Sequence, residues 1–272
     1  MSQEEFVIEA NNLCFQVGKR YLLKDINVQI KAGEHWLIYG MNGCGKTTLL
    51  SILSGFQQQT SGSLKVFGET LTNDNVLNTR KRIGWISSSF FDTRYHHEIV
   101  RDIVLSGCFG TYGIDWEITS EQHLRAMALL KELDLEDKAY QSYDRLSKGQ
   151  RQNVLIARAF MNTPDILLLD EPYSGLDVLA KARFMDLLEK LMERKDLTVL
   201  FVSHEVNDVH DMFPNTLILR NGRVFAKGDT QDLFQDDKLS SFFQQKVAVK
   251  DVIEHRINPL GDTHNIDMEL FK

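Results

Sequence analysis

Short apolar runs separated by turn residues recur along the chain, and they predict an α/β fold. Four runs indicate buried strands: Trp36–Tyr39, Ile83–Ile86, Ile166–Leu169 and Thr198–Ser203. Continuous apolar runs of this kind are typical of strands that are covered on both faces of a sheet. Stretches that we expect to form helices lie between these strands, at Lys46–Gly55, Arg151–Asn162 and Leu179–Glu193.

The beginning of the chain follows a different pattern. Phe6–Ala10 and Leu13–Val17 are candidates for short strands, and Ile26–Ile30 alternates apolar and polar residues as a half-buried strand does. We expect an antiparallel β patch here, laid against the α/β core. Further on, Leu64–Gly68 indicates another strand, and the Asn-Gly pair within Thr216–Gly228 predicts a β-hairpin.

Between the second and third buried strands the pattern becomes helical. His97–Leu105 and Ser120–Leu135 have helical spacing, and the second segment places Leu124, Met127, Leu130 and Leu133 on one face. This predicts a helical subdomain inserted into the core. The expected division is residues 1–91 and 146–231 for the discontinuous core, 92–145 for the helical subdomain and 232–272 for a tail packed on or near the core.

A phosphate-binding motif follows the first buried strand. Gly40, Gly45, Lys46 and Thr47 fit the pattern G-x-x-x-x-G-K-[ST], and they lie between a predicted strand and a predicted helix, as this motif requires. Glycines let the backbone turn its N–H groups inward, the lysine reaches the terminal phosphates and the threonine hydroxyl can bind Mg²⁺. The predicted ATP-binding residues are Gly40, Met41, Asn42, Gly43, Cys44, Gly45, Lys46, Thr47 and Thr48.

Acidic residues end a later strand. Asp170 and Glu171 directly follow the apolar run Ile166–Leu169. Beside a phosphate site, such a pair suits a carboxylate that holds Mg²⁺ through water and a second carboxylate that activates the attacking water. The alternative is a solvated pair of carboxylates at a strand end. His204 also follows a buried strand, where a third polar group near the terminal phosphate is expected.

Composition limits the partners and the cellular environment that we expect for this protein. A net charge of −7 with a pI near 5.6 disfavours general nucleic-acid binding. The three cysteines lack the spacing of a disulfide framework, so we expect reduced thiols in a cytosolic protein. Because no apolar stretch approaches the ~18 residues of a membrane span, any role at a membrane requires a partner.

Leu146-Ser147-Lys148-Gly149-Gln150 resembles the LSGGQ signature of the ABC (ATP-binding cassette) ATPases. Together with Leu167–Pro172 and the turn Ser174–Asp177, it makes the stretch from about Phe6 to Leu233 similar to that family. The resemblance implies a P-loop NTPase core that dimerises head to tail, with ATP between one P-loop and the partner's signature. It implies roles in trans for Ser147, Lys148, Gly149 and Gln150, a D-loop role for Asp177, and a catalytic set of Glu171, His204 and Lys46.

Three positions depart from the family pattern. Lys148 replaces a signature glycine. Ser88 falls where the family has a Mg²⁺-binding glutamine, beside Thr47 and Asp170 as predicted metal ligands. Val17 stands near the position of the base-stacking tyrosine, so adenine stacking falls to Tyr21 or Phe15, each of which is alternatively an ordinary core or surface aromatic.

The resemblance leaves two kinds of function open. The first is the ATP-hydrolysing subunit of a transporter, acting as a homodimer on separate transmembrane permease subunits at the cytoplasmic face of the membrane. The aromatic and aliphatic residues Phe90, Phe91, Tyr95, Ile99 and Val104 then form either a permease socket or the subdomain core. The alternative is a stand-alone soluble ABC ATPase with a non-membrane partner. A P-loop kinase explains neither the signature nor the Asp177 turn.

Overall fold

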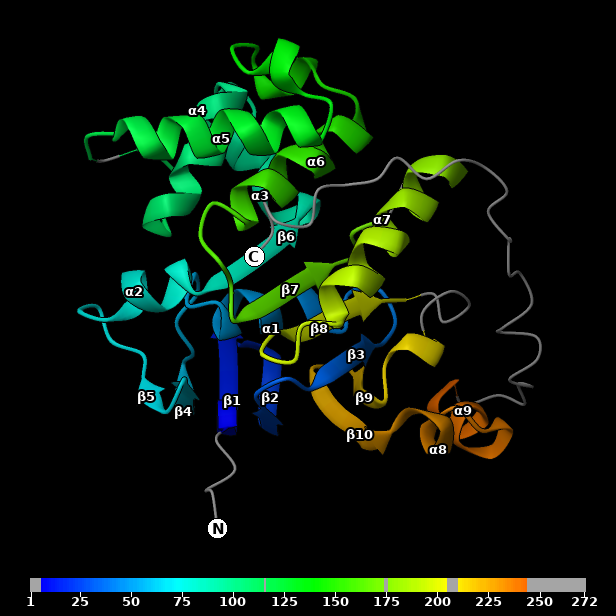
Figure 1. Cartoon of the computed structure of the whole chain (residues 1–272). Coiled ribbons are helices and arrows are strands. Elements are labelled where there is room, and N and C mark those ends of the chain that lie inside the picture. The colour runs from blue at the N-terminus through cyan, green and yellow to red at the C-terminus, as the bar shows by residue number, and fades with distance from the viewer. Residues whose placement is uncertain (1–5, 115, 174–175, 205–209, 244–272) are drawn as a thin grey trace. The chain divides into compact units, whose positions relative to one another are not determined.

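The computed structural model describes residues 6–114, 116–173, 176–204 and 210–243 of the 272-residue chain. They form two compact units (Figure 1). The first comprises the described parts of Met1–Leu71 and Thr198–Asn258, and the second those of Thr72–Leu197. The division into core, helical subdomain and tail stays a prediction. None of the helices in these ranges is long and apolar enough to cross a membrane.

The first unit contains the expected antiparallel β patch. Its strand order is β2 (Arg20–Lys31), β1 (Phe6–Val17), β4 (Ser61–Val66) and β5 (Glu69–Thr70). The two short strands expected at the start are one strand, β1, with an irregularity between Ala10 and Leu13. Asn12 absorbs it with a φ of 47°, and its backbone N–H donates to the side chain of Asn27 on β2.

Strands of the α/β type complete the first unit. β3 (His35–Tyr39) pairs in parallel with β8 (Thr198–Ser203) and with β9 (Asn215–Arg220). The predicted hairpin is confirmed, because β10 (Arg223–Asp229) runs antiparallel to β9. The remaining helical elements are α1 (Lys46–Leu53), the 3₁₀ turn His210–Met212, α8 (Thr230–Leu233) and α9 (Asp236–Phe243).

The C-terminal helices pack their aromatic rings on β3. Phe234 and Phe242 lie with ring centroids 5.6 Å and 5.7 Å from that of Tyr39, which is buried. Burial disfavours the phenolate and raises the pKa of Tyr39 to about 12. Tyr39 therefore stays neutral and acts as part of the core.

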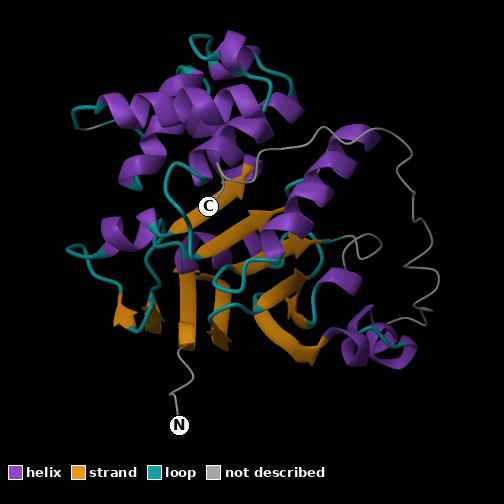
Figure 2. Ribbon diagram, viewed as in Figure 1, coloured by secondary structure: helices purple, strands orange, loops and turns teal. Residues whose placement is uncertain are grey.

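The second unit is mainly helical (Figure 2). Its parallel strand pair is β6 (Ile83–Ser87) and β7 (Ile166–Asp170), with Ser87 opposite Asp170 in register. Its helices are α2 (Val76–Lys81), α3 (Ser88–Tyr95), α4 (Val100–Ser106), α5 (Ser120–Glu132), α6 (Lys148–Ala159) and α7 (Val178–Met192). Short 3₁₀ turns lie at Gly107–Phe109, Glu136–Lys138 and Tyr143–Arg145.

The predicted apolar face of α5 is confirmed at Leu130 and Leu133, which are buried, and wrong at Leu124. Leu124 is 68% exposed, whereas the buried residues of the helix are Ala126, Leu129 and Leu130. Arg125 donates from its guanidinium to the carbonyls of Phe160 and Met161. These two hydrogen bonds to helix-end carbonyls fix the rotation of α5 about its axis. The buried face therefore differs in part from the one that the apolar spacing predicts.

The proposed permease socket is also wrong in its central residues. Phe91, Tyr95 and Val104 are fully buried. The rings of Phe91 and Tyr95, one helical turn apart on α3, stack at 5.3 Å, and Tyr143 donates to the carboxylate of Asp92. The segment after Ser87 is a helix held by a buried cluster, so Phe91, Tyr95 and Val104 belong to the subdomain core, the other alternative that the sequence left open.

One prediction concerns the Asn221-Gly222 turn. Gly222 has a φ of 72°, and a Cβ there would lie 2.4 Å from the carbonyl oxygen of Leu22. We expect Gly222→Ala to lower the free energy of unfolding by about 2–4 kcal/mol, from left-handed strain plus this clash. Gly68, with a φ of 79° and open space at the Cβ position, is the matched control. Gly68→Ala carries the strain alone, so we expect a loss of about 1 kcal/mol. Equal shifts of the urea midpoint for the two variants would contradict the assigned clash.

Candidate functional site

The loop between β3 and α1 curls tightly back on the first unit. A Cβ on Gly40 would lie 2.5 Å from the Leu219 carbonyl oxygen and 2.7 Å from Cys44 Sγ. Gly45 has a φ of 110° immediately before α1 begins at Lys46. Both positions thus require glycine, one for close approach and one for backbone conformation. A glycine-rich loop that leads directly into a helix N-terminus is a setting that suits an anion.

Lys46 is held inside this loop. The side chain is only 5% exposed, and its ammonium donates to the carbonyl of Gly40 at 2.7 Å and to that of Met41 at 3.3 Å. The loop apex at Met41, Asn42 and Gly43 is exposed. The structure therefore combines a fixed positive charge with an accessible loop backbone, as phosphate binding requires.

The β9–β10 turn supports the loop from behind, and sequence reasoning missed this. The Gly222 N–H donates to the Cys44 carbonyl at 2.9 Å, and the Gly222 carbonyl accepts from the Lys24 N–H at 2.8 Å. One peptide segment thus joins the phosphate loop to β2. The Asn-Gly pair could be found in the sequence as a turn, but its long-range partners could not.

His204 follows the strand next to the loop. Tyr39 of β3 and Ser203 of β8 are register partners, so Gly40 and His204 leave adjacent parallel strands at the same sheet edge. His204 is exposed. The structure thus brings the predicted loop and the predicted histidine to one edge.

Tyr21 lies at the β1–β2 turn and is 46% exposed, with the Lys24 ammonium 5.1 Å from its ring centroid. Val17 of the same turn is 58% exposed. An exposed ring beside a cation is able to stack on a base. Its role as the adenine contact stays a prediction.

The second unit holds Asp170 at the end of β7. Asp170 is 4% exposed, and its Oδ2 accepts from Ser87 Oγ at 2.7 Å and from Ser89 Oγ at 3.3 Å. Glu171, which follows, is half-buried and adopts a φ of 49°. A non-glycine residue in this region is strained, and such strain commonly accompanies function. The two serines fix one carboxylate while the chain turns sharply to present the next.

Ser88, the predicted metal ligand, faces another partner. Its hydroxyl donates to Gln152 Oε1 on α6 at 2.9 Å. The neighbours Ser87 and Ser89 contact Asp170, and the sequence analysis did not assign them a role. The hydroxyls of Ser87, at the end of β6, and of Ser89, in the first turn of α3, lie 3.1 Å apart on the side of Asp170, whereas that of Ser88 reaches Gln152. The run Ser87-Ser88-Ser89 gave no sign of which hydroxyl would face Asp170.

The signature segment forms the N-terminus of α6. Ser147 accepts from the Gln150 N–H, while the Gln150 side chain accepts from the Ser147 N–H at 2.9 Å, so Ser147 is the N-cap of α6 and forms a full capping box. Leu146 is buried and anchors the turn, and Ser147 and Lys148 are exposed. The helix N-terminus thus faces solvent and is able to approach an anion.

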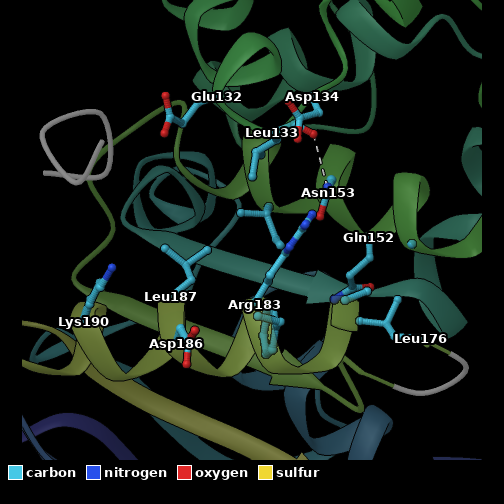
Figure 3. A pocket seen from close by; sticks show the side chains of 14 residues that line it. Glu132, Leu133, Asp134, Gln152, Asn153, Leu176, Arg183, Asp186, Leu187 and Lys190 are labelled. Atoms are coloured by element: carbon cyan, nitrogen blue, oxygen red, sulfur yellow. Dashed lines mark hydrogen bonds between the residues drawn. The ribbon is translucent and has the colours of Figure 1, made fainter. Parts of the chain in front are cut away.

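A pocket of about 150 Å³ lies beside this helix (Figure 3). It is lined by the end of α5, by α6 including Gly149, by Leu176 and by α7. Asp177, which follows Leu176, caps α7 by accepting from the Ala180 N–H at 2.9 Å. The signature helix and the predicted D-loop aspartate are therefore neighbours within one unit. Ser174 and Gly175 of that turn lie outside the described residues.

Comparisons with known proteins agree with this arrangement. The family model described as ABC transporter matches residues 23–174. The chain is 32% identical to an uncharacterised ABC transporter ATP-binding protein, YlmA of Bacillus subtilis, over 89% of this chain and 93% of that protein. Its fold resembles that of cbiO1 from Clostridium perfringens, part of the cbiONQ transporter complex, with a TM-score of 0.68 and 25% identity over 88% of this chain and 94% of the other.

A further solved structure bears on assembly. It is a dimeric ATP-binding cassette in a post-hydrolysis state with ADP and phosphate bound. The TM-score is 0.70 and the identity 29%, over 82% of this chain and 98% of that cassette.

The contacts of Asp170 generate a prediction. Ser87→Ala removes the 2.7 Å hydrogen bond to Asp170, and we expect the Mg²⁺ concentration for half-maximal ATP hydrolysis to rise about 10- to 100-fold, the usual effect of losing a group that orients a metal-binding residue. Ser88→Ala is the matched control, because its hydroxyl contacts Gln152. If Ser88→Ala has the larger effect on Mg²⁺ dependence, the assignment of the two serines is reversed.

Proposed function

The chain belongs to the ABC transporter family of ATP hydrolases, and we propose that it works as a head-to-tail dimer that drives separate transmembrane permease subunits. The observation that carries the proposal is the capped N-terminus of α6. It is exposed at Ser147 and Lys148, as a surface that meets the nucleotide of a partner subunit would be. The dimeric cassette with ADP and phosphate supports the proposal of a dimer.

In the proposed dimer, each P-loop holds the phosphates of one ATP through the N–H groups of residues 40–48 and through Lys46. The partner's Ser147, Lys148, Gly149 and Gln150 face the same nucleotide. The capping box uses both the side chain and the backbone N–H of Gln150, so the N–H groups of Lys148 and Gly149 are those at the helix N-terminus that approach phosphate. Lys148 adds a positive charge where the family has glycine.

Mg²⁺ is the proposed metal, on the chemistry of the predicted donors alone. Thr47 supplies a hydroxyl and Asp170 a carboxylate, and hard oxygen donors are those that Mg²⁺ prefers. When bound with ATP, Mg²⁺ neutralises charge on the phosphates. Asp170 would act through water, and its two serine partners fix its orientation.

Glu171 is the proposed general base for the attacking water. His204 is proposed to orient that water or the terminal phosphate, and Asp177 to act across the dimer interface beside the signature. Tyr21 is the proposed adenine contact.

We place the protein at the cytoplasmic face of the membrane, held there by the permease. The burial of Phe91 and Tyr95 moves the proposed contact to exposed residues of the same helix, and Arg94 is one of them. Its guanidinium donates to the Phe90 carbonyl and lies 3.9 Å from the Phe90 ring centroid. α3 begins directly after Ser87, whose hydroxyl contacts Asp170. A permease bound to α3 would therefore respond to changes at the Asp170 carboxylate.

The chemical role of Glu171 is tested by Glu171→Gln. The amide is unable to accept a proton, so we expect ATP binding to persist and turnover to fall about 10²–10⁴-fold. The variant should accumulate as an ATP-bound dimer of doubled mass in size exclusion. Glu189→Gln, on the exposed face of α7, is the control and should behave as the wild type. Wild-type turnover in Glu171→Gln would remove Glu171 from the mechanism.

The role of the signature in trans is separable from its role as a helix cap. Thr119 caps α5 with the same capping box as Ser147 on α6. We expect Ser147→Ala and Thr119→Ala each to lose about 1 kcal/mol of stability. Only Ser147→Ala should weaken ATP-driven dimerisation and hydrolysis, measured at a temperature where both variants are folded. Equal losses of activity in the two variants would assign Ser147 a purely structural role.

A further inference from the structure

Two histidines and an aspartate converge away from the nucleotide site. His96 and His97 lie between α3 and α4, and Asp144 lies in the 3₁₀ turn Tyr143–Arg145. The Nδ1 atoms of the two histidines are 3.5 Å apart. Oδ2 of Asp144 is 3.8 Å from Nδ1 of His96 and 3.7 Å from Nδ1 of His97.

These separations match the spacing of ligands around a metal ion. The point equidistant from the three atoms lies about 2.1 Å from each, which is the bond length of Zn²⁺ to histidine nitrogen and to carboxylate oxygen. A proton is able to bridge only two of the three atoms, whereas a cation at the centre bonds all three. No other such group of three or more metal-ligating side chains occurs within the described ranges.

Backbone hydrogen bonds hold the two segments together at this point. The Asp144 N–H donates to the His96 carbonyl at 3.1 Å, and the Tyr143 N–H donates to the Glu98 carbonyl at 2.9 Å. Arg151 of α6 donates to the Asp144 carbonyl at 2.9 Å. The backbone segments that carry the three ligands are therefore held together by contacts that do not depend on a metal. Oδ1 of Asp144 is buried without a hydrogen-bond partner in the part of the chain that the structure describes.

We propose that His96, His97 and Asp144 form a binding site for a divalent transition-metal ion. Two imidazoles and one carboxylate suit Zn²⁺ and the neighbouring metals Co²⁺ and Ni²⁺, whereas Mg²⁺ and Ca²⁺ prefer oxygen ligands only. His97 is 85% exposed and His96 57% exposed in their side chains, so the site opens to solvent. A water molecule would complete a tetrahedral coordination sphere.

The position of the site gives it a structural consequence. Two residues, the exposed Arg145 and the buried Leu146, separate Asp144 from the N-cap Ser147. A bound ion would fasten the connection after α3 to the turn that leads into the signature helix. This consequence rests on the proposed function, but the binding of the metal does not.

The test measures Zn²⁺ binding to the full chain, without nucleotide and with any affinity tag removed, by competition with a chromophoric Zn²⁺ indicator. We expect one bound equivalent that millimolar Mg²⁺ or Ca²⁺ does not displace. His97→Ala and Asp144→Ala should each weaken it at least tenfold. Co²⁺ should give the d–d absorption of a four-coordinate nitrogen and oxygen site, and this band should be absent in His97→Ala.

His123→Ala, a histidine on α5 outside the cluster, is the matched control and should keep the bound equivalent. Zn²⁺ should also raise the melting temperature of the wild type by a few degrees and leave that of His97→Ala unchanged, since an ion that binds only the folded state stabilises it. His97 is exposed, so its loss leaves the fold intact. An absence of Zn²⁺ binding, or binding that His97→Ala leaves unchanged, would show that the cluster is an ion pair only. Neither result would change the ATPase activity of the wild type, so the proposed function is tested separately.

Discussion

A loop that binds phosphate through its own backbone has to keep its N–H groups aimed inward, and the β9–β10 turn enforces that shape here. Gly222 donates to the Cys44 carbonyl and accepts from the Lys24 N–H, while the Lys46 ammonium holds the Gly40 and Met41 carbonyls. Close packing at Gly40 and Gly222 leaves no room for a side chain at either place. The loop is therefore preorganised by a hairpin almost two hundred residues further along the chain, and preorganisation of this kind reduces the cost of binding.

In the second unit, three consecutive serines make two different sets of hydrogen bonds. Ser87 and Ser89 hold Asp170, whereas Ser88 bonds Gln152 on the helix that the signature begins. A hydrogen-bonded route thus runs from the strand-end carboxylate to α6. Arg151, the residue before Gln152, reaches the Asp144 carbonyl beside the histidine pair. Hydrogen bonds and the intervening backbone thus connect Asp170, the signature helix and the histidine pair within one unit.

Much of this arrangement was predictable from the sequence. The buried strands, the P-loop, the Asn-Gly hairpin and the Ser147 cap follow from local patterns, and the structure has all of them. The failures share one cause, because each depended on a long-range partner. Arg125 turns α5 toward the carbonyls of Phe160 and Met161, and the Arg158 guanidinium lies 4.7 Å from the ring centroid of the buried Phe91, so neither residue could be placed by periodicity alone. The roles of Ser87 and Gly222 were hidden for the same reason.

The central claim is that the signature of one subunit serves the P-loop of the other, and a mixing experiment tests it most directly. A Lys46→Ala chain lacks a working P-loop, and a Ser147→Arg chain lacks a working signature, so each should be inactive alone. In a head-to-tail heterodimer, one site combines the intact P-loop of the Ser147→Arg chain with the intact signature of the Lys46→Ala chain. The account predicts that mixing the two inactive proteins restores ATP-driven dimerisation and measurable ATP hydrolysis. If every mixing ratio stays as inactive as the separate variants, the signature acts within its own chain and the account is contradicted.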